Sequence, residues 1–573
     1  MTKTIVKRET RYAIHIPKTE YREDAHYVKE KVTYSDDTTL NRTFLVKDYQ
    51  RPIWVSKLAF RGYKDKKEFA PVEELDERMC TQSEINKTIA GMLGMPHLAN
   101  QPDSIKNSPY LYGYDQTSTS LIKLKSLMSN DFIQTPYSVG AFDIETDIIT
   151  REILIATVVF GTKVHVTILR KYLGGRTEVD GKVALAVTKY LPQYSGKLDI
   201  RITVHNDEVD MLKAVFKTAN EWAPDFISVW NIFFDFPRVL ERLKVANVNP
   251  VDVICDQSVP RAYRICKFKE GPTKKEMASG KKMPIKPSLQ WHSLISTTKF
   301  HAIDSMCVYR QIRMAKQEEP SYALDAILQK VLGSRKLSFE EAEQYKGAKW
   351  HMFMQENYPI EYIVYNIYDC LGLLELDAKT KDLAQSLPSG AAMTDFVRFN
   401  SNPKKIVDAL YIFGLERGRV VGTVPKINRK EEDVEADDVP ETEVEMTEEE
   451  ENDPSNYRSL NLKGWIQLLP QNLLLNEGLK CLEDFPDVVT NIRGAVWDVD
   501  ATAAYPTATM VTNTSKETCV NELISIDGIS EEVFREQNLS VCLGGVNSLE
   551  YFNVMFGLPS LDDPFLNALI DQA

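Results

Sequence analysis

Hydrophobic and polar positions alternate most regularly in the middle of this chain, from Ser138 onward. Runs rich in β-branched residues are separated there by turn residues, which predicts successive β-strands. The predicted strands are 139–144, 153–160, 163–169 and, as a buried strand, 226–232. Apolar residues at helical spacing predict helices over 207–220 and 237–245. Strands that alternate with helices indicate an α/β domain, which extends to about Lys379.

The N-terminal part of the chain carries a weaker, mixed pattern. Short β-like runs at 43–46 and 52–59 precede a helical pattern over 81–93. We therefore predict an α+β N-terminal domain over residues 1–135. At about 150 residues per domain, a chain of 573 residues holds roughly three to five domains.

Two pairs of polar residues interrupt the apolar pattern of the α/β domain. Asp143 and Glu145 alternate with apolar residues, so a strand here projects both carboxylates from one face. Tyr365 and Asp369 lie four positions apart, one turn along one face of a predicted helix. Carboxylates set this way beside a phenol are what two divalent metal ions and an attacking water require. These residues predict a nuclease-type site.

A basic segment lies inside the same domain, between residues 261 and 287. Nine Lys and Arg crowd there around two turn signals, Gly271-Pro272 and Ser279-Gly280, which predicts a projecting hairpin. One interpretation is contact with DNA phosphates, and the other is a solvated loop. The candidate DNA-binding lysines are Lys274, Lys275, Lys281 and Lys282.

The negative net charge argues against a nucleic-acid partner, but most of the excess negative charge lies in one short segment. The formal charge is −13, but residues 431–453 hold fourteen Asp and Glu and no Lys or Arg. Without that run the formal charge becomes +1, so basic patches can act on a nearly neutral body. We predict an acidic, disordered loop over 430–455, with a mimic of the phosphate backbone as the alternative.

Cysteine, histidine and hydropathy patterns exclude several further classes. The eight Cys form no Cys-x-x-Cys pair and the eight His no ligand pattern, which argues against zinc ribbons and disulfide frameworks. The start of the chain is charged and polar, unlike a signal peptide, and no run of about 18 apolar residues occurs. We therefore expect a cytoplasmic protein without a membrane partner.

Three segments, in this order, resemble the exonuclease motifs of family B DNA polymerases, most closely those of the T-even bacteriophage type. Asp143-Ile144-Glu145-Thr146 resembles the first motif, Asp-x-Glu. Trp230 to Asp235 resembles the second, which ends in Phe-Asp, and Tyr365 to Asp369 resembles the third, Tyr-x-x-x-Asp. The resemblance implies a ribonuclease H-like 3′→5′ exonuclease domain over 136–380, followed by a return to the N-terminal domain and a linker over 381–429.

The second motif departs from the phage pattern in one spacing. Asn precedes the motif's Asp by five positions in the phage type, whereas Asn231 precedes Asp235 by four. The resemblance places Asn231 and Phe234 against the DNA strand. Asp304, which is also embedded in apolar sequence, is interpreted as a structural acid.

The resemblance implies a role for each exonuclease residue. Asp143 bridges two Mg²⁺ ions, Glu145 and Asp369 hold the ion that binds the attacking water, and Asp235 lies toward the other ion. Tyr365 orients that water, and Mn²⁺ is expected to substitute for Mg²⁺. The alternative, acids satisfied by local salt bridges, fits poorly because unpaired carboxylates in apolar surroundings are costly.

A fourth segment, Asp500 to Thr507, resembles the first polymerase motif of family B. By this resemblance, Asp500 and the Ala501 carbonyl bind catalytic Mg²⁺, and Tyr505 packs under the nucleotide sugar. The usual Ser and Leu are replaced by Ala503 and Ala504.

The second and third polymerase motifs, Lys-x-x-x-Asn-Ser-x-Tyr-Gly and Asp-Thr-Asp-Ser, do not occur after Thr518. We therefore expect a partial palm domain over 456–573 in the large subunit of a split family B replicative DNA polymerase. A second subunit would supply the missing motifs and complete a polymerase site with two Mg²⁺ ions. Expected partners are primer–template DNA, dNTPs and a sliding clamp, in the host cytoplasm if the chain is phage-encoded.

Two alternatives remain open. One is a stand-alone 3′→5′ exonuclease with a relic palm, and the other is a non-catalytic scaffold that holds DNA. The intact exonuclease residues count against the scaffold. Asp500 and Tyr505 count against the relic.

Overall fold

The computed structural model describes residues 3–276, 282–314, 318–424, 542–543 and 546–547. Lys281, the acidic run and the polymerase motif with Asp500, Ala501 and Tyr505 lie outside these residues. The chain divides into two compact units, Met1–Asp437 and Asp438–Ala573. In the second unit, β19 (Cys542–Leu543) pairs antiparallel with β20 (Val546–Asn547).

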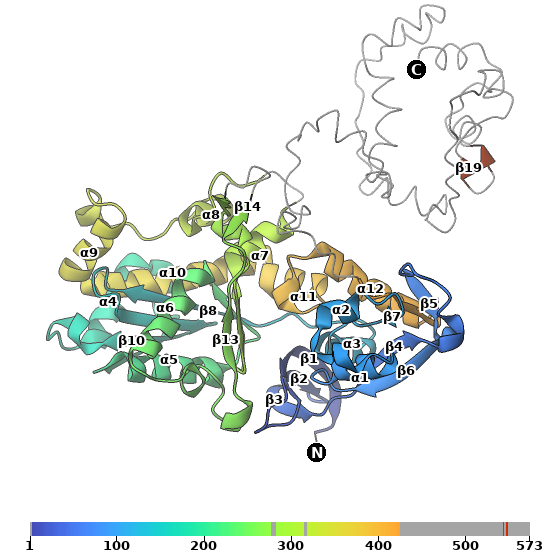
Figure 1. The fold of residues 1–573 in the computed structure, drawn as a ribbon. Coiled ribbons are helices and arrows are strands. Elements are labelled where there is room, and N and C mark those ends of the chain that lie inside the picture. The colour runs from blue at the N-terminus through green and yellow to red at the C-terminus, as the bar shows by residue number, and fades with distance from the viewer. Residues whose placement is uncertain (1–2, 277–281, 315–317, 425–541, 544–545, 548–573) are drawn as a thin grey trace, which may run out of the picture. The chain divides into compact units, whose positions relative to one another are not determined.

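A six-stranded mixed sheet forms the centre of the α/β region (Figure 1). Its spatial order is β11 (Asp199–His205), β10 (Lys163–Leu169), β9 (Ile153–Phe160), β8 (Val139–Thr146), β12 (Phe226–Val229) and β17 (His301–Asp304). β9 runs antiparallel to both of its neighbours, and the remaining pairs are parallel. The helices of this region are α4 (Val179–Tyr190), α5 (Glu208–Trp222), α6 (Ile232–Val245), α7 (Ser305–Ile312), α8 (Leu324–Leu332), α9 (Ala348–Asn357) and α10 (Pro359–Thr380).

The alternation of side chains along β8 gives the sheet two different faces. Phe142 points to α5 and α6, where its ring lies 5.4 Å from Phe216 and 5.7 Å from Phe236, measured between centroids. The acids at positions 143 and 145 project from the other face, against α10. One strand therefore supplies both core packing and polar groups.

The predicted strands over 153–160 and 163–169 are confirmed at both ends. The predictions for 226–232 and 237–245 are partly wrong, because the strand ends at Val229 and the helix begins at Ile232. Asn231 adopts a left-handed conformation (φ 66°), which ends the strand. The Asp304 carboxylate then accepts the Ile232 amide at 3.0 Å and starts the helix ahead of Pro237.

The described part of the N-terminal region contains two three-stranded sheets and three α-helices. β1 (Ile5–Ile16), β2 (Ala25–Tyr34) and β3 (Thr39–Lys47) form one antiparallel sheet, and β6 (Leu75–Cys80), β4 (Arg51–Ser56) and β7 (Leu111–Tyr112) form the other. The helices are α1 (Ile85–Met92), α2 (Pro102–Lys106) and α3 (Ser118–Met128). The helix predicted over 81–93 is thus confirmed, but it begins four residues later and ends one residue earlier than predicted.

Residues that follow α10 return to this N-terminal region. β18 (Arg419–Val421) pairs with β5 (Phe69–Pro71), after α11 (Leu387–Gly390) and α12 (Asn402–Leu415). No helix in the described part of the chain is long and apolar enough to cross a membrane.

A buried ionic cluster ties the N-terminal sheet to the α/β region. Asp225, next to β12, lies 3.0 Å from an Arg11 guanidinium nitrogen and 3.1 Å from the Lys29 ammonium. All three side chains are almost completely buried. Burial raises the pKa of Asp225, but Lys29 and Arg11 outweigh it and lower the pKa to about 2.

We expect Asp225→Ala to destabilise the protein by about 3–5 kcal/mol, because two buried cations lose their counter-ion. Urea denaturation followed by circular dichroism measures the change. Asp210→Ala is the control, since Asp210 pairs with Lys213 on the exposed surface and its loss should leave stability almost unchanged. Equal stability of the two variants would contradict the structural role of Asp225.

Candidate metal centre

Three carboxylates from two elements converge on the polar face of the sheet. Asp143 and Glu145 come from β8 and Asp369 from α10, and one oxygen of each lies within 4.8 Å of the others. The first two share a face because they are two positions apart on a strand. Asp369 joins them because α10 packs against that face of β8. Two patterns more than two hundred residues apart thus form one cluster.

Neighbouring polar groups fix the orientation of these acids. The Asn366 amide donates to Asp143 Oδ2 at 2.6 Å, and the Tyr362 hydroxyl donates to Glu145 Oε2. Asp235, in the first turn of α6, accepts the Ile144 amide at 3.3 Å and so lies against the backbone of β8. The fourth predicted acid therefore borders the same cluster.

The acids are held together in a poorly solvated place. Burial and repulsion from Asp369 raise the pKa of Asp143 to about 8. Burial and repulsion from Asp143 also raise the pKa values of Glu145 and Asp235, and burial raises that of Asp369. Such a cluster ionises fully only if positive charge is brought to it.

The donor set fits divalent metal ions. All four side chains offer carboxylate oxygens, which are the ligands that Mg²⁺ and Mn²⁺ prefer. Asp369 Oδ1 is buried and meets no hydrogen-bond donor among the described residues. An oxygen of this kind is available as a ligand.

Tyr362 and Asn366 were not predicted from the sequence, and neither was a basic residue of the site, Lys336. Its ammonium donates to Asp369 Oδ2 at 2.6 Å and to the Tyr365 hydroxyl at 3.1 Å. Burial disfavours the charged form, but Asp369, Tyr365 and Asp143 outweigh it and raise the pKa of Lys336. Its segment follows α8 and has no pattern that distinguishes it from a solvated loop, so no signal in the sequence could have found it.

The two residues predicted to contact DNA lie where α6 begins. Asn231 precedes its first residue, and Phe234 is half exposed, at 50%. The neighbouring Phe233 instead stacks on His292, with ring centroids 4.2 Å apart. Asp304 accepts backbone amides at the starts of both α6 and α7, which agrees with a structural acid.

The basic segment lies in a basic arm made of two antiparallel strand pairs. β13 (Cys266–Lys269) pairs with β16 (Ser293–Ser296), and between them β14 (Lys274–Glu276) pairs with β15 (Lys282–Pro284). The backbone is thus the hairpin that the turn signals predict. Lys274 and Lys282 are exposed on it. Their role toward DNA stays a prediction.

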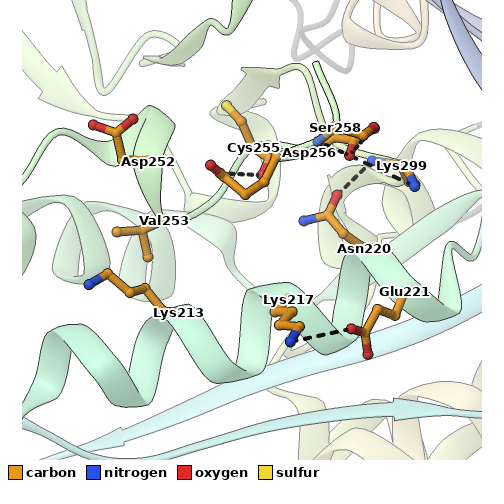
Figure 2. A pocket seen from close by; sticks show the side chains of 11 residues that line it. Lys213, Lys217, Asn220, Glu221, Asp252, Val253, Cys255, Asp256, Ser258 and Lys299 are labelled. Atoms are coloured by element: carbon orange, nitrogen blue, oxygen red, sulfur yellow. Dashed lines mark hydrogen bonds and ion pairs between the residues drawn. The ribbon is translucent and has the colours of Figure 1, made fainter. Parts of the chain in front are cut away.

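A pocket of about 330 Å³ lies elsewhere, between α5 and the segment 252–258 (Figure 2). It contains none of the predicted site residues. Its lysines are balanced by acids, as in the ion pairs Lys217–Glu221 at 3.9 Å and Lys299–Asp256 at 3.8 Å. The acid cluster therefore remains the better candidate for chemistry.

A protein-family model matches part of this chain. A family model described as DNA polymerase family B, exonuclease domain, matches residues 113–327. The match includes Asp143, Glu145 and Asp235, and it ends before Tyr365 and Asp369. No curated protein matches the chain. An exonuclease domain of this family implies nuclease activity on DNA and the use of divalent metal ions.

Proposed function

We propose that the chain is a 3′→5′ exonuclease with a ribonuclease H-like catalytic domain, and that it is the large subunit of a split family B replicative DNA polymerase. The convergence of Asp143, Glu145 and Asp369 carries the nuclease part. The family match supports it, because the first two acids fall inside the matched residues. Digestion of DNA by the wild type and by a variant without these acids is the direct test.

The four acids, Asp143, Glu145, Asp235 and Asp369, would hold two ions of Mg²⁺ or Mn²⁺, which activate an attacking water and stabilise the leaving oxygen. The residues around them set the geometry. Tyr362 donates to Glu145 and orients it. Asn366 does so for Asp143, and Lys336 does so for Asp369.

Tyr365 is suited to positioning the water without taking its proton. Burial and the charge of Asp369 raise the pKa of the phenol, so the hydroxyl stays protonated at neutral pH. Lys336 fixes the hydroxyl oxygen at 3.1 Å. Phe234 exposes half of its surface, and an exposed ring of this kind can stack on a base of the DNA strand.

We expect Lys336→Met to lower the rate of 3′ digestion by about 10–100-fold, as is typical for a residue that supports metal ligands. Lys336 lowers the pKa values of Asp143 and Asp369, so its loss should also move the rising limb of the pH–rate profile to higher pH. Lys330→Met, at an exposed lysine, is the control. A lower rate with an unmoved pH profile would show that Lys336 acts only on folding.

The basic arm is proposed as a DNA contact. Neutralising Lys274, Lys275, Lys281 and Lys282 should weaken DNA binding and flatten its salt dependence, because fewer counter-ions are released. The slope of log affinity against log salt concentration measures this. The exposed lysines Lys182, Lys213, Lys217 and Lys346 give a control with the same loss of charge. An unchanged slope in the arm variant would identify these lysines as a solvated loop.

The polymerase part of the proposal rests on sequence, since Asp500, Ala501 and Tyr505 lie outside the described residues. Residues 1–135 and 381–429 would form the N-terminal domain, and the pairing of β18 with β5 supports their union. Residues 136–380 would be the exonuclease domain, 430–455 an acidic loop and 456–573 a partial palm. Primer–template DNA, dNTPs, a sliding clamp and the second subunit are the proposed partners.

A further inference from the structure

A second group of metal-ligand side chains lies in the N-terminal sheet and shares no residue with the acid cluster. His15 of β1 and His26 of β2 are direct cross-strand partners, with ring centroids 5.0 Å apart. Asp24 is two positions before His26 and projects to the same side. One ligand atom from each residue lies within 4.8 Å of the others.

Two buried atoms of this group lack hydrogen-bond partners. His26 Nδ1 and Asp24 Oδ1 are inaccessible to solvent and meet no donor or acceptor in the described part of the chain. Both side chains are completely buried. Orphaned polar atoms are rare in protein interiors, and two in one cluster of three residues indicate a missing partner.

The other ring nitrogen of His26 and the other oxygen of Asp24 have hydrogen-bond partners. His26 Nε2 lies 2.6 Å from Ser118 Oγ at the start of α3. In the tautomer in which Nε2–H donates to that oxygen, the Nδ1 lone pair is free, as for histidines that bind metals. Asp24 Oδ2 accepts the Ser83 amide at 3.0 Å and lies 2.8 Å from His15 Nε2, so these contacts fix the carboxylate and leave Oδ1 as its unpartnered oxygen.

We propose that His15, Asp24 and His26 bind a Zn²⁺-type divalent cation, with water as the fourth ligand. Two imidazole nitrogens and one carboxylate oxygen favour Zn²⁺ over Mg²⁺, whereas the all-oxygen acid cluster has the opposite preference. The cation and its water reach the site past His15, whose side chain is 22% exposed. Its ligands come from β1, from β2 and from the segment that joins them, so the bound cation stabilises this end of the N-terminal sheet.

Titration of the full-length, chelator-treated protein with Co²⁺ tests the proposal. Four-coordinate Co²⁺ with nitrogen ligands absorbs strongly in the visible range, and six-coordinate Co²⁺ at an all-oxygen site absorbs weakly. We expect one equivalent of strongly absorbing Co²⁺ that Zn²⁺ displaces. The signal should persist in Asp143→Ala with Glu145→Ala, which removes the acid cluster.

Ligand variants complete the test. His26→Ala, Asp24→Asn and His15→Gln should each weaken Co²⁺ binding by more than about tenfold. His97→Ala, at an exposed histidine, should leave it unchanged. His15→Gln alters a partly exposed side chain and keeps the test valid if the buried variants fail to fold. The proposal is overturned if no strong band forms, if it disappears with the acid cluster, or if His15→Gln binds like the wild type.

Discussion

Replacing Asp143 and Glu145 together with alanine is expected to abolish digestion of single-stranded DNA from its 3′ end. The wild type should shorten such DNA with Mg²⁺ or Mn²⁺ and stop when a chelator removes the ion. The variant lacks two of the three carboxylates that converge on the candidate centre, so we expect it to lose the ions that would activate the water. The measurement is the length of 3′-digested, 5′-labelled DNA over time.

The double variant should lose activity without losing its fold. The pKa values of both acids are raised on folding, so at neutral pH these groups ionise more easily in the unfolded chain and destabilise the metal-free protein. Their removal should therefore keep or raise the melting temperature. Asp180→Ala with Glu356→Ala, two exposed acids of the same region, is the matched control and should digest DNA normally. Undiminished digestion by the Asp143 and Glu145 variant would refute the nuclease assignment.

The chain alone is expected to extend no primer, however much DNA it binds. Polymerisation requires two metal ions held by acids from two sides of a palm, and under the proposed function Asp500 is the one acid of that pair in the printed sequence. Extension should appear only when a second chain with the other two polymerase motifs is added. A primer-extension gel with each chain alone and with the mixture measures this.

Asp500→Ala is expected to separate the two proposed activities. It should stop synthesis by the mixture while 3′ digestion continues, because the digestion residues lie in another part of the chain. Asp143→Ala with Glu145→Ala should do the reverse and leave synthesis intact. Extension by the chain alone, or by a mixture containing Asp500→Ala, would contradict the split polymerase. Digestion without any extension in the mixture would favour the stand-alone exonuclease.

Local sequence determined the strands and helices in which residues of one kind recur at a single regular spacing. The alternation around Asp143 and Glu145 predicts a strand with two carboxylates on one face, and β8 has that arrangement. The four-residue spacing of Tyr365 and Asp369 predicts one helix face, and both lie on α10. Backbone geometry alone fixes such relations, so they need no knowledge of distant residues.

Tertiary structure decided everything that depends on a partner far along the chain. Lys336 enters the acid cluster from a loop with no pattern, because the packing of α8 and α10 brings that loop to Asp369. α6 begins ahead of Pro237, the start predicted from the sequence, because the Asp304 carboxylate of β17 accepts a backbone amide of its first turn. His15 and His26 show no ligand spacing in the sequence and meet through the register of two antiparallel strands. Periodicity encodes which face a residue occupies, whereas register and packing decide what that face meets.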